Sequence, residues 1–210
     1  MENSLPPEPA RRALMIAPEA PYPPYGGGAL RAASLAGYLA RRYALDLIVF
    51  REPGAPDPAG ALPPGLFQRV DVLELPRHGR HPAARLWRNL GRAWRGSPPL
   101  NDRFGGFGGA IAAALRGRRY QIAVVEHLWC APYLEQARPH GERVVLDVHN
   151  VESILLERCA RLEPWPASAI LRRFSRASAA AERRWLPLFD LVLASSAREA
   201  ALIAPHVAPG

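Results

Sequence analysis

The chain has 210 residues, of which 49% are hydrophobic and 22% charged, which is ordinary for a soluble globular protein with one large domain or two small ones. It has no apolar run near the roughly 20 residues that span a membrane, and its polar N-terminus lacks the apolar core of a signal peptide. The formal net charge is +8, and all 27 basic residues are arginine. Two explanations remain open for this excess: a GC-rich coding bias, and attraction to phosphates or an anionic membrane surface.

The first half of the chain alternates apolar strands with helices, behind residues 1–12, which are expected to form a disordered tail. Short apolar runs predict strands, and apolar residues at helical spacing predict helices. We expect a strand at 13–17, a helix at 29–42, strands at 44–50 and 69–75, and helices at 82–95 and 104–116. The strand at 69–75 alternates and is expected nearer an edge of the sheet. The buried face of the helix at 29–42 is expected to contain Ala32, Leu35, Ala36, Tyr38 and Leu39.

The second half of the chain continues the same alternation. We expect a strand at 121–126, a short helix at 131–138, a strand at 143–148, helices at 151–163 and 168–185, a strand at 188–194 and a helix at 196–204. Continuously apolar strands with helices between them predict a mostly parallel sheet covered on both faces, a Rossmann-like α/β domain. Ligands of such sheets bind outside the carboxyl ends of the strands, so the residues that follow each strand are the candidate site residues.

The loop after the first strand ends in three glycines, within the segment PPYGGGALR at residues 23–31. Tested against the dinucleotide pattern GxGxxG, Gly26 and Gly28 fit, but Arg31 occupies the last glycine position. The loop is also too long for that fingerprint. Amides at a helix start bind anions, and glycine permits close approach, so the segment predicts a phosphate- or diphosphate-binding loop. The alternative is a flexible loop that closes on a helix.

Two further strands end in polar pairs, Glu126-His127 and His149-Asn150. A histidine at a strand end is suited to hydrogen bonding with a hydroxyl or to proton transfer. Asp147 lies two residues before His149, on the same side of the strand, where it would orient the imidazole. The alternative is that Asn150 caps the following helix and His149 packs in the turn.

Two helices carry arginine on one side and apolar residues, including tryptophan, on the other. At 82–95 the apolar side comprises Leu86, Trp87, Leu90, Ala93 and Trp94, opposite Arg85, Arg88, Arg92 and Arg95. At 168–185 it comprises Ile170, Leu171, Phe174, Ala181 and Trp185, opposite Arg172, Arg173, Arg176, Arg183 and Arg184. Either these stripes pack on the sheet with the arginines solvated, or the helices lie at a membrane interface.

The sequence lacks the motifs of a metal site or a nucleic-acid-binding module. Cys130 and Cys159 are far apart and show no metal-ligand spacing, so we expect reduced thiols in a cytosolic chain. The positive charge alone prompts nucleic-acid binding, but no recognition motif accompanies it.

The order of these features resembles the N-terminal, acceptor-side domain of family 4 retaining glycosyltransferases, which have the GT-B fold. Four segments carry the resemblance: PEAPYPPYGGGALRAASLAGYLA, YQIAVVEHLWCAPYL, VVLDVHNVESILLER and ERRWLPLFDLVLASSAREAALI. It extends over nearly the whole chain from about residue 12. The resemblance implies a Rossmann-like domain at 13–204 that forms one half of a GT-B architecture. Residues 205–210 would begin the linker to a C-terminal donor domain that the sequence lacks.

The resemblance implies a donor side at the glycine loop. Gly26, Gly27 and Gly28 would approach the diphosphate of a nucleotide sugar, and Arg31 would add a cation at the helix start. Stabilising the departing diphosphate there would be electrostatic catalysis. No metal and no cofactor are expected, since the nucleotide sugar is a substrate and this fold type requires no metal.

It also implies an acceptor side at the other two strand ends. His149 would be the catalytic residue, near the acceptor and the donor sugar, while Glu126, His127 and Asn150 would bind the acceptor. The reaction implied is sugar transfer to a glycan or lipid-linked acceptor in bacterial cell-surface or exopolysaccharide synthesis.

The implied location is the cytoplasm, or the inner face of the plasma membrane through a peripheral contact with anionic lipid. The donor domain would be supplied in cis or in trans, and the 210 residues alone are expected to be inactive. The alternative function is a non-catalytic binding or scaffold subunit that needs a partner chain for the donor site.

Overall fold

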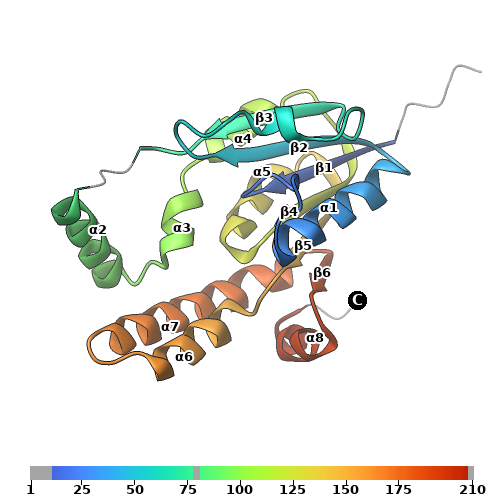
Figure 1. Ribbon diagram of the computed structural model, residues 1–210. Helices are drawn as coiled ribbons and strands as arrows, with labels where there is room; N and C mark the ends of the chain where they lie inside the picture. Colours follow the sequence, from blue (N-terminus) through green and yellow to red (C-terminus); the bar gives the residue numbers. More distant parts are fainter. Residues whose placement is uncertain (1–10, 78–80, 208–210) are drawn as a thin grey trace, which may run out of the picture.

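The computed structural model describes residues 11–77 and 81–207, and it confirms the predicted fold class (Figure 1). Six strands form one parallel sheet in the order β3-β2-β1-β4-β5-β6, with β3 at one edge as expected. Residues 1–10 of the predicted tail and 208–210 of the predicted linker lie outside the described residues. The strands are β1 Arg12–Ala17, β2 Ala44–Arg51, β3 Arg69–Glu74, β4 Tyr120–Glu126, β5 Gly141–Val148 and β6 Leu191–Ala194.

Helices cover both faces of this sheet, and α2 stands apart from it at the left of Figure 1. The helices are α1 Gly27–Ala40, α2 Pro82–Arg95, α3 Pro99–Phe104, α4 Gly108–Leu115, α5 Leu134–Ala137, α6 Glu152–Leu162, α7 Ala167–Trp185 and α8 Ala197–Ile203. Short 3-10 turns lie at η1 Pro58–Ala61, η2 Leu128–Tyr133, η3 Leu186–Leu188 and η4 Ala204–His206. Within the described ranges, no helix combines the length and apolar character needed to cross a bilayer.

Three predicted elements differ from the observed ones. The helix expected at 104–116 begins only at Gly108 as α4, because Gly106 has a φ of 89°, which a helix interior does not accommodate, and Phe104 instead ends a separate short helix, α3, that was not predicted. The helix expected at 131–138 starts as the 3-10 turn η2. The strand expected at 188–194 begins only at Leu191, since the preceding chain forms η3 around Pro187.

Side chains of the central strands alternate between two cores, as the period of two in a strand requires. Leu14 and Ile16 of β1 belong to the core that includes side chains of α4, α5 and the end of α7. Ala13 and Met15 belong to the core beneath α1. Because both faces of β1 are covered, the strand is continuously apolar, which is the pattern that predicted a parallel sheet.

Helix α1 covers one sheet face with small residues. Its expected face is largely correct, but Tyr38 is 46% exposed and does not belong to it. The Tyr38 ring instead lies 4.3 Å from the guanidinium carbon of Arg42, a cation–π contact at the surface. The buried residues of α1 are Ala32, Ala33, Ala36 and Leu39.

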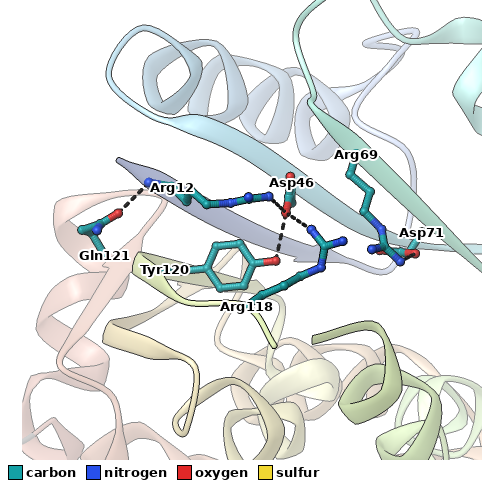
Figure 2. A network of polar contacts seen from close by, with 7 residues as sticks. All are labelled: Arg12, Asp46, Arg69, Asp71, Arg118, Tyr120 and Gln121. Atoms are coloured by element: carbon teal, nitrogen blue, oxygen red, sulfur yellow. Dashed lines mark hydrogen bonds and ion pairs between the residues drawn. The ribbon is translucent and has the colours of Figure 1, made fainter. Parts of the chain in front are cut away.

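A polar network ties the amino edge of the sheet together (Figure 2). Asp46 of β2 is 2% exposed, and its Oδ2 accepts hydrogen bonds from Arg12 Nη2 at 2.7 Å, Tyr120 Oη at 2.9 Å and Arg118 Nη1 at 3.2 Å. Burial and the adjacent carboxylate raise the pKa of Tyr120, so its hydroxyl stays protonated as a donor. The network joins β1, β2 and β4 at the edge opposite their carboxyl ends.

Candidate functional site

The strand order reverses between β1 and β4, because the chain builds outward through β2 and β3 on one side and through β5 and β6 on the other. In an open parallel sheet this switch point leaves a crevice at the carboxyl ends of the strands, where ligands bind. The structure brings the predicted site residues of three separate segments to this edge. They are Gly26, Gly27, Gly28, Arg31, Glu126, His127, His149 and Asn150.

The three glycines form the start of α1. Gly26 is the N-cap, with a φ of 93° that favours glycine, and α1 begins at Gly27, two residues earlier than predicted. No side chain caps this helix start. A Cβ on Gly26 or Gly27 would meet nothing within 4 Å. The first-turn amides thus have no side-chain cap and lie at the positive end of a 14-residue helix, which is an arrangement suited to anion binding.

Gly28 brings the helix start against His149. A Cβ at position 28 would lie 3.3 Å from Nδ1 of the imidazole, so glycine is what allows this close approach. The His149 side chain is only 8% exposed. Its Nε2 lies 3.4 Å from Asp147 Oδ2 but makes no hydrogen bond of good geometry. The structure thus places His149 between the glycine helix and the expected orienting carboxylate.

Glu126 and Asp147 are register partners at the ends of β4 and β5. Two residues earlier on each strand, Val124 and Val145 belong to the core beneath α1, so both carboxyl groups lie on the sheet face that α1 covers. Glu126 is 2% exposed and Asp147 is fully buried. Two carboxyl groups in one buried site disfavour each other's ionisation.

Arg31 of α1 resolves this conflict at Asp147. Its Nε donates to Oδ1 at 3.0 Å and to Oδ2 at 2.9 Å, and its Nη2 donates to Oδ1 at 2.5 Å and to the carbonyl oxygen of Ala194 at 3.2 Å. Burial alone would raise the pKa of Asp147, but the imidazole of His149 and the Arg31 guanidinium hold it below its ordinary value. Arg31 therefore links α1 to β5 and to the end of β6, and these two donor atoms are committed to protein partners.

Glu126 has no such cation in direct contact. Burial, followed by the neighbouring charge of Asp147, raises the pKa of Glu126 to about 8, against a smaller opposing effect of Arg31. The carboxyl group is therefore mostly protonated at neutral pH and serves as a hydrogen-bond donor as well as an acceptor. Its Oε1 is buried and has no partner among the described residues.

His127 has an unusual backbone and a depressed basicity. Its φ of 65° is left-handed, which is uncommon for a residue with a side chain. The ring stacks on Trp129 at a centroid distance of 4.1 Å and makes a tilted contact with the ring of His149 at 3.8 Å. Burial, with the neighbouring His149, lowers the pKa of His127 to about 3, so the imidazole is neutral at physiological pH.

Asn150 lies in the turn after β5 and does not cap α6. The N-cap of α6 is Val151, which makes no side-chain capping bond, so the capping alternative for Asn150 is wrong. Asn150 is exposed and lines a pocket together with Ser195, Ser196 and Arg198, which follow β6. The pocket extends the candidate site from the end of β5 to the end of β6.

The same cluster offers a geometry that could accept a metal ion. Glu126, Asp147 and His149 each contribute one ligand atom, and these atoms lie within 4.8 Å of one another. Arg31 already occupies both oxygens of Asp147, and its positive charge opposes a second cation at this carboxylate. The two cysteines, Cys130 and Cys159, are free.

Two participants were missed from the sequence, Trp129 beside His127 and the role of Arg31 as the partner of Asp147. The sequence did contain a signal for the Arg31–Asp147 pair. Asp147 lies two residues after Val145 on the same strand, so both side chains point to the same sheet face, which a helix covers. A buried carboxylate on that face requires a cation. Trp129 follows His127 by two residues in the 3-10 turn η2, for which the sequence showed no periodic signal.

No protein-family profile and no curated protein matches this sequence. Several solved structures share its fold, including the following two. Sucrose-phosphate synthase from Thermosynechococcus elongatus aligns with 94% of this chain at 14% identity and a TM-score of 0.58, with 46% of that chain covered. UGT71G1 from Medicago truncatula, complexed with UDP-glucose, aligns with 95% of this chain at 14% identity and a TM-score of 0.51, with 50% of that chain covered.

The chain therefore spans about half the length of either structure. At such low identity the likeness concerns the fold. The chain has the architecture of one Rossmann-like half of a GT-B glycosyltransferase.

Proposed function

We propose that this chain is the acceptor-binding half of a nucleotide-sugar-dependent glycosyltransferase of the family 4 type. The observation that carries the proposal is the uncapped helix start at Gly27, next to the His149 cluster, in which three buried polar atoms have no hydrogen-bond partner among the described residues. Glu126 Oε1, His149 Nε2 and Trp129 Nε1 are such atoms. Buried polar groups are normally hydrogen-bonded, so an unsatisfied group calls for an explanation such as a bound ligand.

In this proposal the start of α1 binds the donor, and the histidines and Glu126 contact the sugar and the acceptor. The free amides of Gly27 and Gly28 hold the diphosphate of the donor and stabilise its charge as it leaves. His149 contacts the sugar and the acceptor from its place beside Gly28 at the start of α1. Protonated Glu126 and neutral His127 bind acceptor hydroxyl groups. The nucleotide itself is held mainly by a second Rossmann-like domain, in cis or in trans.

The substrates follow the same reasoning. The donor is a nucleotide sugar, which fits the UDP-glucose in the complex of the Medicago truncatula protein with a similar fold. The acceptor is a glycan or a lipid-linked saccharide of the bacterial cell surface, and the reaction takes place in the cytoplasm. The 210 residues alone have no transfer activity, because most of the donor site belongs to the other domain.

The test is His149→Ala in the full natural protein that contains this chain, assayed by release of nucleoside diphosphate from a panel of nucleotide sugars. Loss of a group that assists proton transfer lowers turnover by roughly 100-fold or more. His206→Ala is the control, since His206 lies in η4 outside the cluster. Undiminished transfer by His149→Ala, in a protein that remains folded, would remove His149 from the site.

A further inference from the structure

The apolar side of α2 does not pack on the sheet. Trp87, Leu90 and Trp94 form a stripe at helical spacing and are 73%, 47% and 84% exposed. The side chains of Leu86 and Arg85, which were expected on opposite sides of this helix, lie outside the described residues. The remaining apolar residues settle the orientation: the stripe faces away from the protein.

Ion pairs on the other side of α2 fix this orientation. Arg92 is 7% exposed, and its Nε donates to Asp102 Oδ2 at 2.8 Å, while Arg95 Nη2 donates to Asp102 Oδ1 at 3.1 Å. The helix is also tied to α7, because Arg173 Nη2 donates to the carbonyl oxygen of Trp94 at 2.5 Å. The helix is therefore anchored by its arginine side, and its tryptophans project outward.

A second apolar group is exposed at the turn between α6 and α7, at the same end of the molecule as α2 in Figure 1. Leu162 is 86% exposed and Trp165 is 81% exposed. Three of the five tryptophans of the chain thus lie exposed at one end. We call this surface the tryptophan end; it comprises Trp87, Leu90, Trp94, Leu162 and Trp165.

The helices that carry the tryptophan end are rich in exposed arginine. The exposed arginines of α2, α6 and the first half of α7 are Arg95, Arg158, Arg161, Arg172, Arg173 and Arg176. Among described residues of the same segments, Glu163 is the exposed acidic side chain, and half-buried Glu157 is paired with Arg161 at 3.7 Å. Tryptophan beside arginine is the combination that suits the headgroup region of an anionic bilayer.

We propose that the tryptophan end docks on an anionic lipid surface. The tryptophans insert at the level of the headgroups, and the exposed arginines of the same helices contact lipid phosphates. Charge complementarity selects this occupant over a neutral apolar partner, because the exposed arginines of α6 and α7 outnumber the acidic side chains beside them and an apolar protein surface would supply no further counter-charge. Each arginine near an anionic surface contributes roughly fivefold to partitioning, so binding falls as salt rises. The proposal does not depend on sugar transfer.

The experiment is co-sedimentation of the purified protein with phosphatidylglycerol-containing vesicles and with pure phosphatidylcholine vesicles. We expect binding to the anionic vesicles and quenching of tryptophan fluorescence by brominated lipid chains. The triple variant Trp87→Ala, Trp94→Ala, Trp165→Ala should lose at least about tenfold in partitioning, with its unfolding temperature unchanged because these side chains are exposed.

A matched leucine pair supplies the control. Leu162→Ser should weaken binding, while Leu188→Ser should not, since Leu188 is 50% exposed at the opposite end of the 19-residue helix α7. Equal binding of the triple variant and the wild type would overturn the proposal. So would equal binding to both kinds of vesicle, or self-association through these residues, seen by sedimentation velocity, without vesicle binding.

Discussion

Replacing Glu126 by glutamine should make the protein more stable at alkaline pH than the wild type. In the unfolded chain this carboxyl group ionises with an ordinary pKa near 4.5, whereas in the fold its pKa is about 8. Between these values the unfolded state releases a proton that the folded state retains, so the stability of the wild type falls as pH rises. The full difference corresponds to roughly 5 kcal/mol above pH 8, and most of it is already present at about pH 8. Glutamine has nearly the same shape and no proton to lose, so the variant escapes this destabilisation.

The measurement is urea unfolding of both proteins at about pH 5 and about pH 8. The advantage of Glu126→Gln in the free energy of unfolding should be small at the lower pH and grow to several kcal/mol at the higher one. Glu152 also has a raised pKa, about 7, because of burial and nearby Glu182, but its titration is common to both proteins and cancels in the difference. Glu142→Gln, on an exposed side chain of β5, is the control and should show no such trend. A difference that is constant with pH would refute the assignment of a protonated, buried Glu126.

Four further substitutions test the interactions around the site and at the opposite edge. Arg31→Ala removes the guanidinium that pairs with the fully buried carboxylate of Asp147, and should cost about 3 kcal/mol in urea unfolding at neutral pH, less in acid where the carboxylate is neutralised. Asp46→Asn leaves two guanidinium groups without their counter-charge and should cost about 2 kcal/mol by the same measurement, while activity per folded molecule is unchanged. Gly27→Ala, which meets nothing within 4 Å, should stabilise by about 0.5 kcal/mol in thermal unfolding. Gly28→Ala should gain less than Gly27→Ala, because its Cβ contacts His149, and a larger gain would contradict the close approach.

The sheet was predictable from the sequence because each central strand is a short apolar run bounded by turns. The strand order, and with it the switch point between β1 and β4, was not, since pairing depends on contacts between segments distant in the chain. The predicted helix boundaries were wrong where a local backbone conformation interrupted the hydrophobic periodicity. Gly106, which has a positive φ and lies between α3 and α4, is an example.

The sequence predicted which residues at the strand ends belong to the candidate site, but it did not predict which of them contact one another. Periodicity placed His149 and Glu126 at the carboxyl edge, and the structure brings them together there. The pairing of Arg31 with Asp147 joins residues 116 positions apart, so it required the tertiary arrangement. The proposed roles of these residues in binding donor and acceptor stay predictions.

The left-handed backbone of His127 has a consequence for the evolution of this chain. Within two neighbouring positions the fold tolerates a disfavoured φ of 65° and a carboxyl group whose Oε1 is buried without a hydrogen-bond partner among the described residues. In landscape terms both positions are locally frustrated. The amino edge also buries two unpartnered atoms, Asp46 Oδ1 and Arg12 Nε, but within a network of ion pairs. Selection for thermal stability alone would therefore erode His127 and Glu126 first. Substitutions at these two positions should therefore raise stability and lower activity.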